Sequence, residues 1–80
     1  MKTYEMVRNE YFALCEKEAE VSRRLIAENA IDASEIYEIR EEGYRLLTSY
    51  AESGVISYDD AAKIIIDWEE FRHPDSTANW

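Results

Sequence analysis

Apolar residues recur at intervals of three and four positions through the first third of the chain. An α-helix makes one turn in about 3.6 residues, so this spacing gathers them on one side of a helix. The segment from about Tyr4 to Glu28 is therefore predicted to form one long helix with an apolar stripe. The stripe contains Tyr4, Val7, Tyr11, Leu14, Val21 and Leu25.

A second helix is predicted between Asp32 and Gly54. Asp32 and Glu35 have the spacing of a capping box, in which two side chains bond free backbone N–H groups of the first turn. Ile31 and Ile36 stand where a hydrophobic staple would hold the start of the helix. Gly54 is expected to end it, because glycine readily adopts the left-handed conformation that follows a last turn. The predicted buried face contains Ile36, Ile39, Leu46, Leu47 and Tyr50.

Three residues interrupt the apolar faces of these two helices. Gly43 lies on the second face, where glycine costs about 1 kcal/mol relative to alanine. Close approach by the backbone of a neighbouring helix or an accidental glycine would each account for it. Glu18 and Arg40 are charges at positions where apolar residues are expected. In an antiparallel pair of helices they come within reach of one another, so we expect an ion pair. The alternatives are long side chains that extend to the solvent and polar contacts inside a dimer seam.

A third helix is predicted from Ser57 to the pair His73-Pro74. Ser57 is expected to cap its first turn, where Asp59 and Asp60 lie at the positive end of the helix dipole. Pro74 should end the helix, because the residue before a proline is disfavoured in the helical conformation. The predicted inner face contains Ala61, Ile64, Ile65, Trp68 and Phe71.

The links between the predicted helices are only a few residues long, so neighbouring helices should run antiparallel. We therefore predict an all-α three-helix bundle in residues 1–72, with a long first helix, an antiparallel second helix and a shorter third helix. A flexible C-terminal tail is predicted at 73–80. The first helix is longer than its partners, so one end of its apolar stripe is expected to overhang. A second copy of the chain could cover that end, which leaves a homodimer open.

Eighteen acidic residues against nine basic ones give the chain a net charge of −9 at pH 7. Proteins bind phosphate groups through lysine and arginine, so this chain should bind neither nucleic acid directly nor an anionic membrane. A basic protein surface is the partner that the charge favours, although many acidic proteins are acidic only to stay soluble. No signal-peptide pattern is seen, and the longest apolar run, Ile64 to Ile66, is too short to span a bilayer. A cytoplasmic location is therefore expected.

The sequence contains no pattern typical of an enzyme. A nucleophile needs a neighbouring base, and the one histidine, His73, stands beside the predicted tail. Cys15 lies on an apolar stripe and is expected to be a small buried side chain. The acidic run at 35–42 resembles MazG-like nucleotide pyrophosphohydrolases, but Arg45 stands where their E-E-x-x-E motif has an acid. We therefore predict no catalytic residue, no metal site and no cofactor.

Outward-facing helix positions supply the candidate partner-binding residues. Ile66 is an apolar side chain among acids, which suits an anchor in a partner's pocket. The candidates are Glu35, Glu38, Glu42, Asp59, Ile66, Asp67 and Glu70. In size and charge the chain is similar to small phage-encoded inhibitors such as anti-CRISPR proteins and nucleic-acid mimics. That resemblance implies docking on a basic, nucleic-acid-binding surface of a larger protein, which is thereby blocked or adapted. The alternative is a structural homodimer or assembly subunit joined through its apolar stripe.

Overall fold

The computed structural model describes residues 2–72. They form three α-helices: α1 at Tyr4–Ala27, α2 at Ser34–Glu52 and α3 at Tyr58–Arg72. No residue in this range belongs to a strand, so the predicted all-α three-helix bundle is confirmed. The predicted tail at 73–80 and the predicted stop at His73-Pro74 lie outside the described residues.

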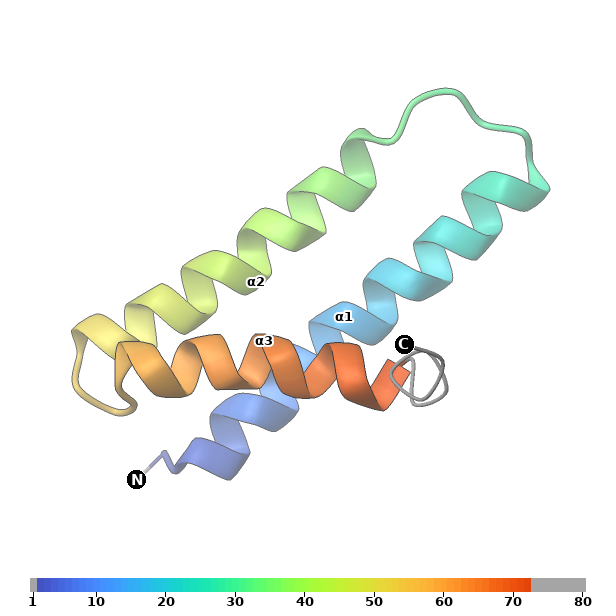
Figure 1. Ribbon diagram of the computed structural model, residues 1–80. Coiled ribbons are helices and arrows are strands. Elements are labelled where there is room, and N and C mark those ends of the chain that lie inside the picture. The colour runs from blue at the N-terminus through green and yellow to red at the C-terminus, as the bar shows by residue number, and fades with distance from the viewer. Residues whose placement is uncertain (1, 73–80) are drawn as a thin grey trace.

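The three helices are arranged as a hairpin and a crossing helix (Figure 1). α1 and α2 run antiparallel, and α3 lies across the end of this hairpin that holds the first turns of α1. At 1.5 Å per residue, α1 is about 36 Å long and α3 about 22 Å. α3 therefore covers only part of the hairpin, and the predicted overhang of the first helix is present.

The start of α2 differs from the sequence prediction. Its N-cap is Ala33, whose methyl side chain cannot accept a hydrogen bond from the first turn. Asp32 instead accepts a hydrogen bond from the Ser34 N–H at 2.9 Å, and Glu35 binds Arg24 of α1. The predicted capping box is wrong, because a charge-assisted bond across the hairpin engages the glutamate that would have completed it. The predicted staple is also wrong, since Ile31 is fully exposed.

The link between α2 and α3 follows the prediction closely. Gly54 directly follows the last turn of α2 with a φ of 82°, a conformation that glycine adopts without steric cost. Ser57 Oγ accepts a hydrogen bond from the Asp60 N–H at 3.0 Å, and Asp60 Oδ2 accepts one from the Ser57 N–H at 3.3 Å. This reciprocal pair is a capping box. The predicted cap at Ser57 is confirmed.

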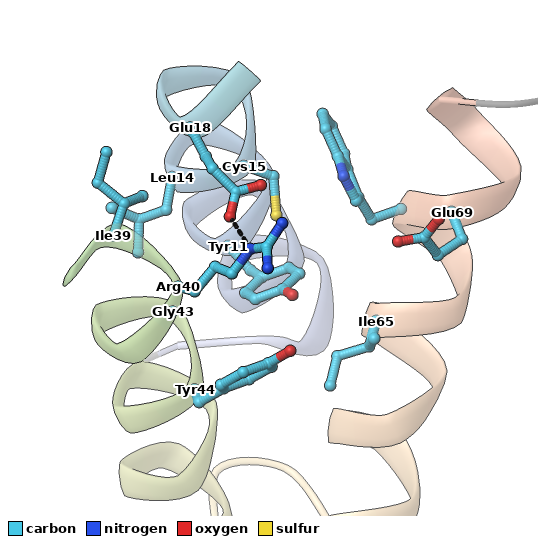
Figure 2. Close-up of a pocket in the computed structure, with 11 residues that line it drawn as sticks. Tyr11, Leu14, Cys15, Glu18, Ile39, Arg40, Gly43, Tyr44, Ile65 and Glu69 are labelled. Carbon is cyan, nitrogen blue, oxygen red and sulfur yellow. Dashed lines mark hydrogen bonds and ion pairs between the residues drawn. The ribbon is translucent and has the colours of Figure 1, made fainter. Parts of the chain in front are cut away.

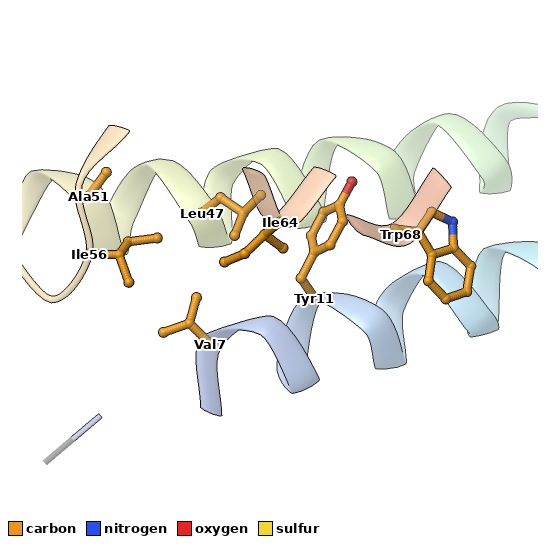
Figure 3. Packing of buried hydrophobic residues seen from close by; sticks show 7 residues of the cluster. All are labelled: Val7, Tyr11, Leu47, Ala51, Ile56, Ile64 and Trp68. Carbon is orange, nitrogen blue, oxygen red and sulfur yellow. The ribbon is translucent and has the colours of Figure 1, made fainter. Parts of the chain in front are cut away.

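The hydrophobic core lies where α3 crosses the hairpin (Figure 3). All three helices contribute to it, and Ile56 joins it from the α2–α3 link. Val7 and Ile64 have no exposed surface. Phe71, predicted on the inner face, is 61% exposed, because it lies at the margin of the core beside the rings of Phe12 and Trp68. The buried cluster contains Val7, Tyr11, Leu47, Ala51, Ile56, Ile64 and Trp68.

The far end of the hairpin lies beyond α3, and within residues 2–72 it is formed by α1, α2 and their link alone. Val21 and Ile39 are the last buried side chains in that direction. We call the apolar group at this tip the hairpin end. It contains Leu25, Ile26, Ile31 and Ile36.

In the described part of the chain, no helix has the length and apolarity needed to cross a membrane.

Candidate functional site

A groove of about 300 Å³ opens between the three helices, next to the core (Figure 2). Each helix presents residues three or four positions apart, which is the spacing of a single helix face. The groove forms because α3 crosses the hairpin at an angle, so side chains of α3 and the hairpin diverge away from the core. Its lining consists of Tyr11, Leu14, Cys15, Glu18, Ile39, Arg40, Gly43, Tyr44, Ile65, Trp68 and Glu69.

Gly43 allows α1 and α2 to pack closely at the floor of this groove. A Cβ atom at position 43 would lie 3.0 Å from Cε1 of Tyr11, closer than side chains normally approach one another. Close approach is therefore the reason for this glycine, but the approaching group is a side-chain ring of α1 and not its backbone. Tyr11 is only 7% exposed, and this burial raises the pKa of its phenol. The hydroxyl group is therefore neutral at physiological pH.

Glu18 and Arg40 form the ion pair that the sequence predicts. Arg40 Nε donates a hydrogen bond to Glu18 Oε1 at 2.5 Å, joining α1 to α2 at the groove (Figure 2). The hydrogen bond to Glu18 raises the pKa of Arg40. The two side chains differ greatly in burial, since Glu18 is 14% exposed and Arg40 is 55% exposed. The pair is thus anchored on the α1 side and hydrated on the α2 side.

The groove also holds Cys15, which was predicted to be buried and is half-buried. It lies on the same face of α1 as Tyr11 and Glu18. Within residues 2–72, no three histidine, cysteine, aspartate or glutamate side chains come together in a way that could hold a metal ion. The chemistry that the lining offers is aromatic stacking, apolar contact and charge pairing.

The predicted partner-binding residues on α2 lie along one exposed stripe. Glu35, Glu38 and Glu42 are all exposed, and Glu35 accepts two hydrogen bonds from Arg24, at 2.9 and 3.0 Å. Arg40 lies two residues from both Glu38 and Glu42 and faces the groove. Two residues correspond to a rotation of about 200° around a helix axis. Glu38 and Glu42 therefore point away from the groove, whereas Glu35 is turned toward Arg24 of α1.

The predicted residues on α3 fall on two sides of that helix. Asp59, Ile66 and Glu70 share its outer face, and Ile66 is 56% exposed. Asp67 was expected to face outward with them, but its side chain is only 25% exposed and lies against α1. The structure thus separates the seven candidates into an α2 stripe, an outer α3 face and an inter-helix contact.

Asp67 joins α3 to the first turns of α1. Its carboxylate accepts a hydrogen bond from the Tyr4 hydroxyl at 3.1 Å and lies 3.5 Å from Arg8 Nε. Partial burial and this hydrogen bond raise the pKa of Tyr4. Asp67 takes this position because α3 crosses the start of α1, which turns the side of α3 that carries position 67 toward Tyr4 and Arg8.

Sequence reasoning did not identify the groove as a site. Its most accessible aromatic residue, Tyr44, is 53% exposed although it follows the buried Gly43. The sequence around Tyr44 does not indicate a groove, because the third wall, Ile65 and Glu69 of α3, depends on the crossing of the helices. No protein-family model, curated protein or solved structure matches this chain.

Proposed function

We propose that this protein is an acidic helical module that binds a basic surface of a larger protein and blocks or adapts it. The observation that carries the proposal is the outer face of α3, where Ile66 is 56% exposed between the exposed acids Asp59 and Glu70. Positions 59, 66 and 70 are separated by seven and four residues, so they share one helix face. We call these three residues the outer face.

The outer face combines the two features of a contact surface that is guided by charge. An exposed isoleucine supplies an apolar anchor for a pocket, and anchors of this kind account for much of the binding energy of an interface. The flanking carboxylates and the net charge of −9 attract a basic partner and speed its approach. Lys63 falls on the same side of α3. Its ammonium group lies 5.7 Å from the centre of the Tyr4 ring of α1, so this basic side chain is directed toward α1.

The size and charge shared with phage-encoded inhibitors make the proposal more specific. Anti-CRISPR proteins and nucleic-acid mimics occupy basic channels that otherwise hold nucleic acid. We propose the same kind of partner surface here, with the acids of the outer face in place of phosphates. The exposed acids Glu38 and Glu42 on α2 would then act at longer range, by increasing the rate of approach.

The test is affinity capture of a partner from a host lysate, followed by binding kinetics with the captured protein. The variants are Ile66→Asp and the double reversal Asp59→Lys/Glu70→Lys. The matched control, Glu5→Lys/Glu20→Lys, makes the same change in net charge at exposed positions of α1. We expect the double reversal to lose the partner, Ile66→Asp to dissociate faster, and the control to retain binding. Equal capture by all four proteins, unaffected by salt, would contradict the proposal.

A second candidate function is self-association through the hairpin end. Ile31 is fully exposed and Ile26 is 74% exposed, and no other helix of the described chain covers them. A second copy would bury both side chains in a structural homodimer. In that case sedimentation would show a dimer that persists in high salt and dissociates in the variant Ile26→Asp/Ile31→Asp. A monomer at all concentrations would exclude this function.

A further inference from the structure

The groove between the helices is lined by aromatic rings from all three of them. Tyr11 belongs to α1, Tyr44 to α2 and Trp68 to α3. In Figure 2, the side chains of Tyr11 and Tyr44 extend into the space that separates the hairpin from α3. The faces of such rings carry partial negative charge and attract organic cations within about 6 Å. Tyr11 and Trp68 are each 7% exposed and form the wall of the groove, whereas Tyr44 is 53% exposed. The ring of Tyr44 is therefore the one that suits a guanidinium or alkylammonium group.

Charged side chains in the groove favour a cation as well. Glu69 extends from α3 into the same space (Figure 2), and none of the basic side chains that the structure describes forms an ion pair with it. Among the residues that the structure describes, Arg40 is the one basic residue in the groove lining, and its charge is balanced by the hydrogen bond to Glu18. Two carboxylates and one guanidinium leave the lining negative, in a chain whose net charge is −9.

The groove is accessible and has the volume for a single side chain. Its volume of about 300 Å³ is at the lower end of the range for ligand pockets, which is too small for a helix. Tyr44 and Arg40 are each more than half exposed, so the groove opens to solvent along α2. A long side chain can therefore enter from the surface.

The groove and the outer face are neighbouring sides of the same helix. Ile65 and Glu69 line the groove, whereas Ile66 and Glu70, the next residue in each case, lie on the outer face. One residue corresponds to a rotation of about 100° around the helix axis. A protein that covers Ile66 therefore passes close to the α3 edge of the groove.

We propose that the groove receives one lysine or arginine side chain of the basic partner, with its cation over the ring of Tyr44 and near the carboxylate of Glu69. This inference rests on the proposed function, in which the protein binds such a basic partner. It adds a second contact, in which the apolar anchor Ile66 enters the partner and a basic side chain of the partner enters this protein. An anion bound by Arg40 is the opposite outcome, which the experiment below distinguishes.

The test uses capped tripeptides as probes and nuclear magnetic resonance as the readout. Acetyl-Gly-Arg-Gly-amide and its lysine counterpart are titrated into the ¹⁵N-labelled full chain, with the glutamate counterpart as the anionic probe. We expect both basic peptides to shift the indole N–H of Trp68 and the amides of Gly43 and Tyr44, and the glutamate peptide to leave them unchanged. Shifts caused by the glutamate peptide alone would overturn the inference in favour of an anion site.

Two variants and a matched control locate the cation. Glu69→Gln and Tyr44→Leu should each weaken binding of the basic peptides, by roughly two- to fivefold for loss of one exposed cation contact. Glu70→Gln removes the same charge one residue away, on the outer face, and should leave the affinity unchanged. Equal weakening by Glu69→Gln and Glu70→Gln would show only diffuse attraction and would overturn the inference. Circular dichroism of each variant confirms that the helices are retained.

The inference and the proposed function can fail separately. If basic peptides leave the groove resonances unchanged while Ile66→Asp impairs partner capture, the groove assignment is overturned and the proposed function stands. If the peptides bind in the groove but the outer-face variants capture the partner normally, the groove remains a cation site and the outer face is overturned.

Discussion

The ring of Tyr11 lies so close to Gly43 that a Cβ atom at position 43 would come within 3.0 Å of it. This contact lets a large aromatic side chain of α1 occupy the space that a side chain of α2 would otherwise fill. The ring thereby takes part in both the buried cluster and the lining of the groove. The groove and the core are thus linked through one residue pair.

Gly43→Ala is expected to destabilise the protein although alanine is the better helix former. Alanine recovers about 1 kcal/mol of helix propensity, but overpacking a core typically costs about 1–3 kcal/mol. We expect a net loss of about 1 kcal/mol in urea denaturation. In a Tyr11→Leu background the ring is gone, and the same change should stabilise the protein. Identical effects in the two backgrounds would show that the contact is unimportant.

The Glu18–Arg40 pair should respond asymmetrically to the loss of each partner. Arg40→Leu leaves a carboxylate that is only 14% exposed without its cation, which costs about 1–3 kcal/mol. Glu18→Leu leaves a guanidinium that is more than half exposed and stays hydrated, so it should cost less. The double variant should be more stable than Arg40→Leu alone. Free energies of unfolding that simply add would contradict this coupling.

Acid should weaken the contact between the start of α1 and the end of α2. Glu10 accepts hydrogen bonds from Lys2 Nζ at 2.7 Å and from the Tyr50 hydroxyl at 2.8 Å. The hydrogen bond from Lys2 and, to a smaller extent, the one from Tyr50 lower the pKa of Glu10 below its ordinary value of 4.5. A lowered pKa in the folded state stabilises the protein above pH 4.5, and the contribution is lost as the pH falls from 4.5 through the folded-state value.

Urea denaturation between pH 6 and pH 3 measures this effect. Wild type should be more stable than Glu10→Gln at pH 6, and the difference should shrink as the pH approaches 3. A difference that stays constant over this range would show that the ionised form of Glu10 makes no particular contribution.

Local sequence spacing gave a wrong prediction where a charged residue has more than one partner within reach. The spacing of Asp32 and Glu35 predicts a capping box, yet Arg24 lies close enough to bind Glu35 at 2.9 Å. The same spacing of Ser57 and Asp60 does form a capping box. Local spacing alone cannot distinguish these two cases, because the outcome depends on which charge the neighbouring helix presents.

In the candidate site too, contacts between neighbouring helices could be predicted from the sequence, and contacts between distant segments could not. The antiparallel arrangement of the first two helices was sufficient to predict the Glu18–Arg40 pair, since the short link determines which residues face each other. The position of Asp67 could not be predicted in this way. Its partners, Tyr4 and Arg8, are some 60 residues away in the chain, and nothing in the sequence near position 67 indicates that α3 crosses them.

The three helices, most of their buried faces and the ends of the α2–α3 link could be predicted from the amino-acid sequence alone. These features follow from apolar periodicity, capping side chains and a left-handed glycine, all of which act over a few neighbouring residues. The place where α3 crosses the hairpin could be seen only in the folded protein. The groove, the inward position of Asp67 and the exposure of the hairpin end all depend on that crossing. The crossing is set by how side chains of all three helices fit together in the core, and that fit depends on residues that are distant in sequence.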